Sequence, residues 1–513
     1  MRRIRRPFSF LIIFFLITVS NVSASRIHQE DGIFPNHSCE YIRTLNRFAS
    51  TKADAAFYNP AGLSFLEEDG LHVMFSAQTL YVKKTHAMDY YAIQVVGSNE
   101  TPVQSFHTRS PFTANTDTNI HMSNLPDQYY SETTSPVLPD FDVVYKQDNW
   151  TAYFDFSVMQ AAPGTTFANG AAVIDWGNLA IKETECAKDY ATDPTTVPEL
   201  RGYYRKAEAT RDEMFIGATF GGSYLINNSL SVGGGVRIIK ANGQMTIDVT
   251  DVLFFKRNPI SGEDFMLNGD DWHIDTEYEG LGFGFISSLD YKVSDALNFG
   301  VKCEYYTPLE LDKTTNRFTA PSVVEKGGNL DVFKDGSPSP GNELEYLHGL
   351  GQSELKVTYP PTLAAGISYG VLDNLKIDGS LEISFRDQVD LDGREDDYDL
   401  GYKYGMALRW AVKEDLEASC GYLYTNFGIK EDKRNESDML LPNHAIGGGF
   451  GIKLSKNTEI SLGASYIFSE DKQTDIDEFT NATDPTWHSL RKDFKEKRYI
   501  FSTGITYRFD NLL

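Results

Sequence analysis

The feature that most constrains the fold is an alternation of apolar and polar side chains, with a period of two, over long segments. In "RYIFSTGITYRF" (498–509), Tyr499 and Ile505 belong to an apolar face, whereas Arg498 belongs to a polar one. The segment "LKIDGSLEISFR" (375–386) repeats the pattern. Successive side chains of a β-strand point to opposite faces, so both segments are predicted strands. Strands of roughly 12 residues exceed the usual 5–6 of soluble sheets, which favours a membrane-spanning barrel over a soluble sandwich.

Fourteen such segments follow one another, and the connections between them alternate in length. The short connections read "QDN", "INNS", "VSDA", "LDN", "KED" and "SKN", and the alternate ones are long. This alternation predicts an all-β fold, a transmembrane antiparallel β-barrel of about 14 strands, with both termini on the short-turn side and the long loops facing outward from the cell. The predicted strands are 71–82, 140–146, 150–161, 213–225, 230–241, 273–292, 297–310, 355–370, 374–386, 400–412, 415–428, 443–454, 458–469 and 497–509. The predicted loops are 83–139, 162–212, 242–272, 311–354, 387–399, 429–442 and 470–496.

The N-terminus has the pattern of a cleaved signal peptide. Four arginines precede the apolar run "FSFLIIFFLITV" (8–19), and "VSA" at 22–24 fits a cleavage site. Twelve residues are too few for a membrane-spanning helix, which needs roughly 20. The chain is therefore expected to be exported to the bacterial outer membrane. Cleavage would leave 43 basic against 72 acidic residues, a net charge of −29, which disfavours a nucleic-acid partner.

Residues between the leader and the first strand are predicted to obstruct the barrel. A lumen of this size would leak if it were empty, because it lies between barrels filled by side chains and open porins. The expected organisation is therefore a signal peptide (1–24), an N-terminal hatch or plug (25–70) and the barrel with its long loops (71–513).

The stretch "ADAAFYNPAGLSFL" (53–66) ends this predicted hatch. An alanine-rich run that could be helical must stop at Asn59, because Pro60 has no N–H group and moves the preceding residue out of the helical region. Gly62 then gives the backbone freedom to turn. The stretch therefore predicts a helix, a rigid break and a sharp turn directly before the first strand.

The longer stretch "ADAAFYNPAGLSFLEEDGLHVMF" (53–75) resembles the start of the FadL/TodX family of outer-membrane transporters of long-chain fatty acids and hydrophobic compounds. "GLGFGFISSLDYKVSDALNFGVKCEYYTPLEL", "YPPTLAAGISYGVLDNLKIDGSLEI" and "LPNHAIGGGFGIKLSKNTEISLGASYIF" are similar to the family's hairpins. The resemblance implies a non-enzymatic channel for passive uptake of hydrophobic compounds, most of all long-chain fatty acids. It also implies a hatch motif with a gating role at Asn59, Pro60, Ala61 and Gly62. The alternative is that these four residues only turn the chain from the plug to the wall.

An amphipathic ligand needs apolar surface where it lands and a cation for its head group. The resemblance implies initial capture by the extracellular loops, where the candidates are Leu253, Phe254, Phe255, Phe265 and Met266; packing of the loop on itself is the alternative. Inward-facing cations could pair with a carboxylate, or with acidic side chains of the lumen such as Asp378 and Glu382. The cationic candidates are Arg237, Lys376, Arg386 and Arg409.

Enzymatic and metal-binding motifs do not emerge from the sequence, and no cofactor or metal is expected. There is no G-x-S-x-G, H-E-x-x-H or paired cysteine motif. The acidic "DLDGREDDYD" (390–399) lacks the spacing of a calcium-binding EF-hand and is better explained as a solvated loop. Cys303 and Cys420 are predicted free thiols on outward faces, and a disulfide between Cys39 and Cys186 remains open.

The expected partners are a hydrophobic small molecule, such as a fatty acid or an aromatic hydrocarbon, and the lipid of the outer membrane. The barrel is expected to be a monomer. Two alternative functions remain open at this point: a surface adhesin or receptor whose loops bind a partner, and a general diffusion porin.

Overall fold

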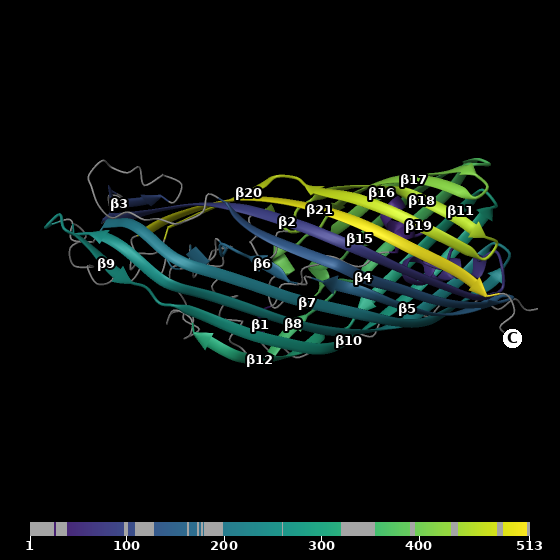
Figure 1. Ribbon diagram of the computed structural model, residues 1–513, viewed down its shortest axis with the longest axis horizontal. Helices are drawn as coiled ribbons and strands as arrows, with labels where there is room; N and C mark the ends of the chain where they lie inside the picture. The colour runs from purple at the N-terminus through teal and green to yellow at the C-terminus, as the bar shows by residue number, and fades with distance from the viewer. Residues whose placement is uncertain are drawn as a thin grey trace, which may run out of the picture.

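The strands of the computed structural model form one sheet that closes on itself (Figure 1). The structure describes residues 25–26, 38–96, 101–107, 128–161, 164–171, 174–175, 178, 199–258, 260–319, 354–389, 395–431, 440–479 and 486–509. The ring closes where β2 (Gly70–Val96) pairs antiparallel with β21 (Thr486–Phe509) along its length. Closure leaves no free sheet edge in the membrane, as a spanning sheet requires. The predicted signal peptide lies outside the described residues.

Tracing hydrogen-bonded neighbours around the described ring gives fourteen antiparallel wall strands, here called staves. Four of the staves are interrupted, so that each of these four consists of two labelled strands. This confirms the predicted 14-stranded barrel. In chain order the staves are β2, β4 (Tyr129–Gln147), β5 with β6 (Trp150–Ala161, Thr165–Phe167), β7 (Glu199–Asn227), β8 (Leu230–Arg257), β10 (Trp272–Ser294), β11 with β12 (Leu297–Tyr306, Leu309–Thr319), β13 with β14 (Glu354–Val357, Thr362–Leu372), β15 (Leu375–Ser384), β16 (Gly401–Lys413), β17 (Leu416–Asn426), β18 (Asn443–Ser455), β19 with β20 (Thr458–Ser469, Lys472–Phe479) and β21.

Three short strands lie outside this ring of staves. β3 (Thr101–His107) folds back on β2, and β9 (Asp264–Asn268) folds back on β8. β1 (Ser25–Arg26) pairs parallel with β13, away from the short turns. The prediction that both termini lie on the short-turn side is therefore wrong for Ser25 and Arg26, whereas β21 ends there.

The predicted strand ends are accurate at the short turns, whereas several of those at the opposite end are wrong. β5 and β19 have the predicted bounds, but β2 continues to Val96, β8 continues to Arg257 and β7 begins at Glu199. Parts of the predicted loops 83–139, 162–212 and 242–272 are therefore strand. The 28 residues of β8 extend about 90 Å, whereas the apolar band of such barrels is about 25 Å tall. Beyond that band the outer face no longer needs to be apolar, so the lipid-facing pattern ends while the backbone ladder continues and side chains such as Ile247 and Val249 stay buried on the inner face.

Aromatic side chains form two girdles on the outer surface. Toward the long-loop end, ring contacts of 5.0–6.3 Å link neighbouring staves from β16 to β2 through Tyr404, Tyr424, His444, Phe468, Tyr466, Tyr499 and Tyr81. A second set is exposed near the short turns and comprises Trp150, Tyr224, Tyr291, Tyr369, Trp410 and Tyr507. Aromatic rings prefer the two membrane–water interfaces, so these girdles mark the membrane-spanning zone of the wall.

The strand register predicts which face of β21 meets lipid. Ile505 is 44% exposed on the outer face, whereas its neighbour Thr506 points inward. Ile505→Arg is expected to lower the free energy of unfolding by about 2–4 kcal/mol, because an arginine would face hydrocarbon. Thr506→Arg is the matched control and should be tolerated better. Reversible denaturant unfolding in lipid vesicles measures both, and equal losses would show that the register is inverted.

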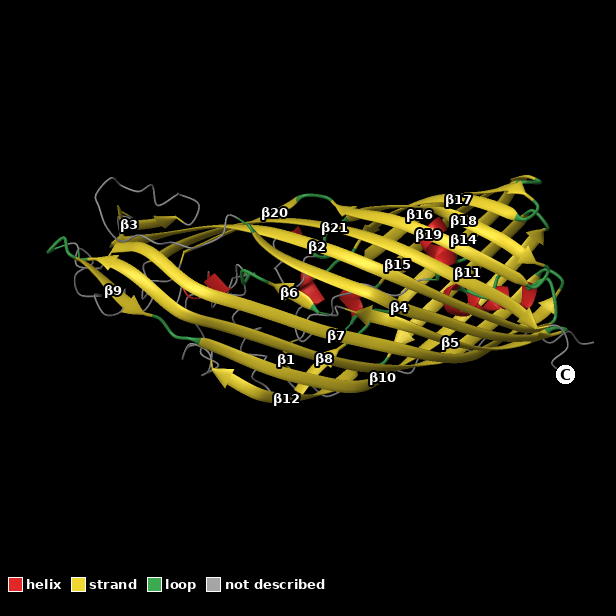
Figure 2. Ribbon diagram, in the orientation of Figure 1, coloured by secondary structure: helices red, strands yellow, loops and turns green. Residues whose placement is uncertain are grey.

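Short helices occupy the interior near the short-turn end (Figure 2). They are α1 (Cys39–Thr44), α2 (Ala55–Tyr58) and the 3-10 helix η1 (Pro60–Phe65); two further 3-10 helices, η5 (Arg386–Gln388) and η6 (Glu395–Asp397), follow β15. In the described part of the chain, no helix has the length and apolar character needed to cross a membrane.

Candidate functional site

Residues 38–66, here called the hatch, pass through the interior of the barrel. The Ser38 hydroxyl accepts a hydrogen bond from the Tyr41 N–H (3.1 Å) and so caps α1. Leu45 ends this helix in the left-handed region at φ 58°. Asn59 is extended at φ −161° and ends α2, and Pro60 begins η1. The break therefore lies where the sequence places it, with proline at a helix start, where its missing N–H costs nothing.

Aromatic rings form the centre of the hatch. Tyr58 stacks on Tyr41 (centroids 5.2 Å apart) and meets Phe57 and Phe48 edge-on. This group joins apolar side chains of the wall, including Leu80, into one buried cluster. Packing between hatch and wall therefore forms a buried apolar cluster inside the barrel.

Glycines on the inner face of the wall leave the space that the hatch backbone occupies. A Cβ atom at Gly421 would lie 1.9 Å from the Thr44 carbonyl oxygen, and one at Gly300 would lie 2.0 Å from the Phe48 carbonyl oxygen. No side chain fits at such distances. Five glycines of this kind, here called the glycine seat, come from five different strands and are Gly233, Gly300, Gly366, Gly421 and Gly447.

A partly buried ionic network ties the first half of the hatch to the wall. Arg43 is fully buried and pairs with Glu40 (2.5 Å) and with Glu417 of β17 (2.7 Å). Lys52 pairs with Glu459 of β19 (2.7 Å) and lies 3.8 Å from Glu40. Burial alone would raise the pKa of the Glu40 carboxyl, but the charges of Arg43 and Lys52 outweigh it and hold that pKa well below its usual range. Glu417 and Glu459 are partly exposed, so the buried guanidinium of Arg43 is the costly charge to leave without a partner, and its pairing with Glu417 attaches α1 to the wall.

The four residues predicted as the hatch motif are all buried and lie against β10. The Asn59 amide donates to the Asp290 carboxylate (2.7 Å) and to the Phe48 carbonyl (3.1 Å). The Ala61 N–H donates to the Ser288 hydroxyl (2.9 Å). Pro60 is packed over the glycine seat, and a Cβ at Gly62 would lie 2.1 Å from the Ser50 carbonyl oxygen. The motif is thus held on one side by the wall and on the other by the hatch itself.

Two cations lie against Phe57 of the hatch. Arg237 of β8 is fully buried and donates to the Tyr306 hydroxyl (2.8 Å) and to Glu304 (3.1 Å), and its guanidinium lies 4.7 Å from the Phe57 ring. Lys302 of β11 donates to the Phe57 carbonyl (3.0 Å) and pairs with Glu304 (3.0 Å). Tyr306 belongs to a buried apolar cluster of the lumen that also contains Phe215 and Tyr359. A cationic group, an aromatic hatch residue and a buried apolar cluster therefore meet at one point.

The other predicted head-group cations lie elsewhere. Lys376 and Arg409 are directly opposite each other on β15 and β16, near the short turns, and Arg409 holds Asp378 with two hydrogen bonds (2.6 and 2.8 Å). Arg386 lies in η5, where its guanidinium faces the rings of Tyr398 (5.6 Å) and Phe427. The four candidates are thus divided among three places.

The predicted capture residues lie on strands rather than in an irregular loop. Leu253, Phe254 and Phe255 belong to β8 and Phe265 and Met266 to β9, in a hairpin where Phe255 is opposite Met266. Phe254 is buried against the ring of Tyr203 (5.2 Å), whereas Met266 is 55% exposed. The five predicted capture residues are therefore divided between a buried and a more exposed face of the hairpin, because neighbouring residues of a strand face opposite ways.

The described cysteines are free thiols. Cys39 begins α1 and is buried; burial raises the pKa of its thiol to about 12. Cys303 and Cys420 are exposed, and Cys186 lies outside the described residues, as do residues 390–394 of the acidic loop. Among the described side chains, no group of three or more His, Cys, Asp or Glu residues is arranged to hold a metal ion.

Sequence reasoning missed the residues that seat the hatch. Arg43 and Glu417 carry no motif, because they are 374 residues apart in the chain. The glycine runs at 233–235 and 447–449 were a usable signal, since glycine weakens a strand unless another backbone approaches closely.

Comparison with known proteins identifies the family. Residues 209–509, more than half of the chain, match the model of the outer membrane protein transport protein family (OMPP1/FadL/TodX). No curated protein matches the chain. A FadL homologue from Pseudomonas aeruginosa has a similar structure (TM-score 0.57, 14% identity), covering 95% of this chain and 100% of the homologue. The deltaS2 mutant of the monoaromatic hydrocarbon channel TodX is also similar (TM-score 0.50, 11% identity), covering 94% of this chain and 100% of TodX.

These structural likenesses concern the fold, and the family model concerns the sequence of the wall. Both agree with the family that the sequence resemblance named, which is thereby confirmed, although the N-terminal stretch 53–75 lies outside the matched residues. The chain therefore belongs to the outer membrane protein transport protein family (OMPP1/FadL/TodX), whose members are non-enzymatic β-barrel channels for hydrophobic compounds in the bacterial outer membrane.

Proposed function

We propose that this chain takes up long-chain fatty acids by passive diffusion and that the hatch gates their passage. The observation that carries the proposal is the pair Arg237 and Lys302 beside the apolar cluster of Phe215, Tyr306 and Tyr359. A fatty acid has a carboxylate that pairs with cations and a tail that prefers apolar side chains. A neutral aromatic hydrocarbon would use only the second property.

Phe57 links this ligand site to the gate. It contacts both cations, through its ring and its carbonyl, and lies two residues before Asn59. A carboxylate that binds Arg237 or Lys302 competes with these contacts and so weakens one attachment of the hatch. The ligand thereby favours the open arrangement of the hatch, because it binds the open arrangement more tightly than the closed one. Any conformational change driven by a ligand requires such a difference in affinity. Initial capture by Leu253, Phe255, Phe265 and Met266 of the β8–β9 hairpin completes the proposed route, with Phe254 supporting it from the buried face.

Gating by the motif is tested with Pro60→Ala. Proline restricts its own φ angle and the conformation of Asn59, so alanine allows arrangements that the native break excludes. A change in backbone freedom of this kind is worth about 0.4–1 kcal/mol, so the rate of uptake should rise about two- to fivefold at equal amounts of protein in the vesicles. Transport of a radiolabelled long-chain fatty acid into proteoliposomes measures the rate.

The matched control for this experiment is Pro308→Ala, at an exposed proline of the wall between β11 and β12. It should leave uptake unchanged. If Pro60→Ala also leaves uptake unchanged, the motif is only a turn, and the gating part of the proposal is wrong.

A general diffusion porin is the weaker alternative. Buried packing of Tyr41, Tyr58 and Leu80 across the lumen argues against free passage of polar solutes through the closed barrel. Vesicle swelling with sugars separates the two functions, because a porin admits sugars without any change to the hatch.

A further inference from the structure

A buried carboxylate without a basic partner lies beside the helix break of the hatch. Asp290 of β10 is fully buried, and among the described residues no lysine or arginine pairs with it. Its polar contacts are the side-chain amides of Asn59, from the hatch, and Asn298, from β11. A buried charge is costly unless a charge of the opposite sign accompanies it. The position of Asp290 therefore calls for a positive charge that the neighbouring side chains do not supply.

Three buried oxygen atoms at this place accept no hydrogen bond from any described residue. They are the Oδ1 atoms of Asn59, Asp290 and Asn298, in side chains of residues that are 0%, 0% and 9% exposed. The Asn59 amide nitrogen is already engaged, since it donates to Asp290 (2.7 Å) and to the Phe48 carbonyl (3.1 Å). Buried acceptors without a partner are uncommon in folded proteins, so three around one carboxylate indicate a partner from outside the chain.

The atoms gathered here are those that hard cations prefer. Carboxylate, amide and carbonyl oxygens bind Ca²⁺, and backbone carbonyls also coordinate Na⁺. Two hatch carbonyls lie against the same amides: Asn59 donates to Phe48, and Asn298 donates to Ala49 (3.3 Å). Each carbonyl oxygen keeps a second lone pair for a further partner. The site combines one carboxylate with neutral oxygens, and so differs from a cluster of acidic or imidazole ligands.

A glycine of the wall makes the room for this arrangement. Gly300 is directly opposite Asp290 in the β10–β11 ladder. A Cβ atom at Gly300 would lie 2.3 Å from the Asn59 amide nitrogen, closer than any side chain tolerates. The absence of a side chain at this position therefore allows the hatch asparagine to reach the buried carboxylate.

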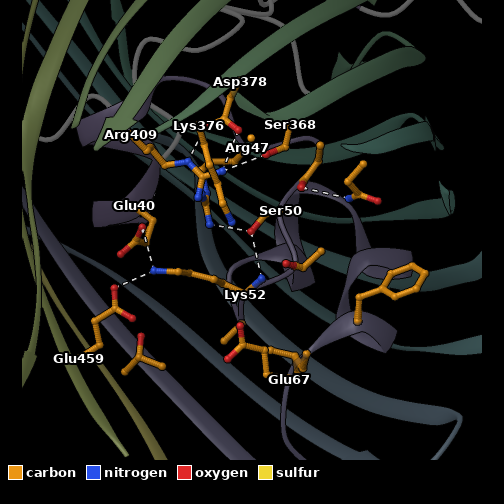
Figure 3. A pocket seen from close by; sticks show the side chains of 18 of the residues that line it. Glu40, Arg47, Ser50, Lys52, Glu67, Ser368, Lys376, Asp378, Arg409 and Glu459 are labelled. Carbon is orange, nitrogen blue, oxygen red and sulfur yellow. Dashed lines mark hydrogen bonds and ion pairs between the residues drawn. The ribbon is translucent and has the colours of Figure 1, made fainter. Parts of the chain in front are cut away.

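A cavity of about 610 Å³ between the hatch and the short turns gives access to the site. Ala49 and Asn298 both line it. Figure 3 shows this cavity, in which Lys52 pairs with Glu459 and Arg409 pairs with Asp378. Since these basic groups have acidic partners, their charges are offset along the approach of a cation.

We propose that Asp290, Asn59 and Asn298 bind a hard cation, with Na⁺ as the expected ion, and that this cation holds the hatch on the β10–β11 hairpin. One Na⁺ neutralises the single carboxylate, whereas Ca²⁺ leaves one positive charge buried. The bound cation joins Asn59, the residue before Pro60, to two strands of the wall. The inference goes beyond the proposed function, because it assigns a resident ion to the barrel rather than a transported compound.

Hydrogen–deuterium exchange of the full-length protein in non-ionic detergent tests the inference. Exchange is followed at one pH and one ionic strength in the chloride salts of N-methyl-D-glucamine, Na⁺ and Ca²⁺. The glucamine cation is too large to enter a buried site. A ligand at ten times its dissociation constant stabilises the bound form about tenfold, so hatch peptides that contain Asn59 should exchange about tenfold more slowly in Na⁺ than in glucamine.

Asp290→Asn removes the charge but keeps an oxygen that can accept the Asn59 hydrogen bond, and should make exchange equal in all three salts. Asn298→Ala removes one oxygen and should raise the Na⁺ concentration for half-maximal protection about fivefold. The matched control is Asp295→Asn, at a fully exposed carboxylate in the turn of the same hairpin, which should keep the full effect of Na⁺. Heat-modifiable migration on a gel checks that each variant is folded.

Two results overturn the inference. Equal exchange of the native protein in all three salts would mean that no cation binds and that Asp290 is a neutral acid. An effect of Na⁺ that persists in both Asp290→Asn and Asn298→Ala would place the cation elsewhere. Protection by Ca²⁺ without protection by Na⁺ supports the site and assigns it to a divalent ion. None of these results depends on which compound the barrel transports.

Discussion

Deleting residues 25–66, with the predicted signal peptide (1–24) retained, is expected to convert the closed barrel into one that admits small polar solutes. The deletion removes Tyr41 and Tyr58, which pack against wall side chains inside the barrel. The wall should survive, because its ladder is formed by residues 70–509 and closes without the hatch. Fourteen strands enclose more space than the eight whose side chains fill a barrel, so the rate of sugar entry should rise roughly tenfold or more.

Swelling of proteoliposomes in sugars of increasing size measures this effect, with the full-length protein as the control. Heat-modifiable migration on a gel checks that the truncated barrel is folded. A truncated barrel that stays closed to the smallest sugar would contradict the prediction. The barrier would then be the lumen cluster that contains Tyr306 and Tyr359.

Gly421→Ala is expected to displace the hatch without opening the wall. Its Cβ would lie 1.9 Å from the Thr44 carbonyl oxygen, and backbone on both sides cannot yield as a flexible side chain would. Overpacking of this kind costs about 1–3 kcal/mol. Because Thr44 is next to Arg43, the same shift also disturbs the pairing of Arg43 with Glu417. Trypsin should therefore cleave the hatch much faster in the variant than in the native protein.

Gly448→Ala is the matched control. Gly448 is on the adjacent strand, and the nearest atom to its added Cβ is the Ser419 carbonyl oxygen at 3.4 Å, an ordinary contact distance. Arg43 and Arg47 are buried in the native protein, so the appearance of tryptic fragments ending there reports release of the hatch. Equal protection of both variants would mean that the hatch can shift to fit an added methyl group and that the glycine seat does not constrain it.

The sequence by itself determined the wall. A membrane-spanning strand must present apolar side chains on one face throughout the bilayer, and this requirement is local and repeated in every stave. The outward position of Ile505 and the bounds of β5 and β19 follow from it directly. The outer face follows this rule only within the bilayer; beyond it β8 continues to Arg257 with apolar side chains such as Ile247 and Val249 buried on its inner face.

The helix break at Asn59 and Pro60 was also predictable, because proline acts on the residue next to it. What surrounds that break was decided only by the tertiary structure. Asn59 meets Asp290 across 231 residues of chain, and Arg43 meets Glu417 across 374. Contacts between such distant residues have no period in the sequence. They exist because closure of the barrel brings the inner faces of many strands around one buried segment, and an arginine or a glycine acquires its role only from what lies opposite it there.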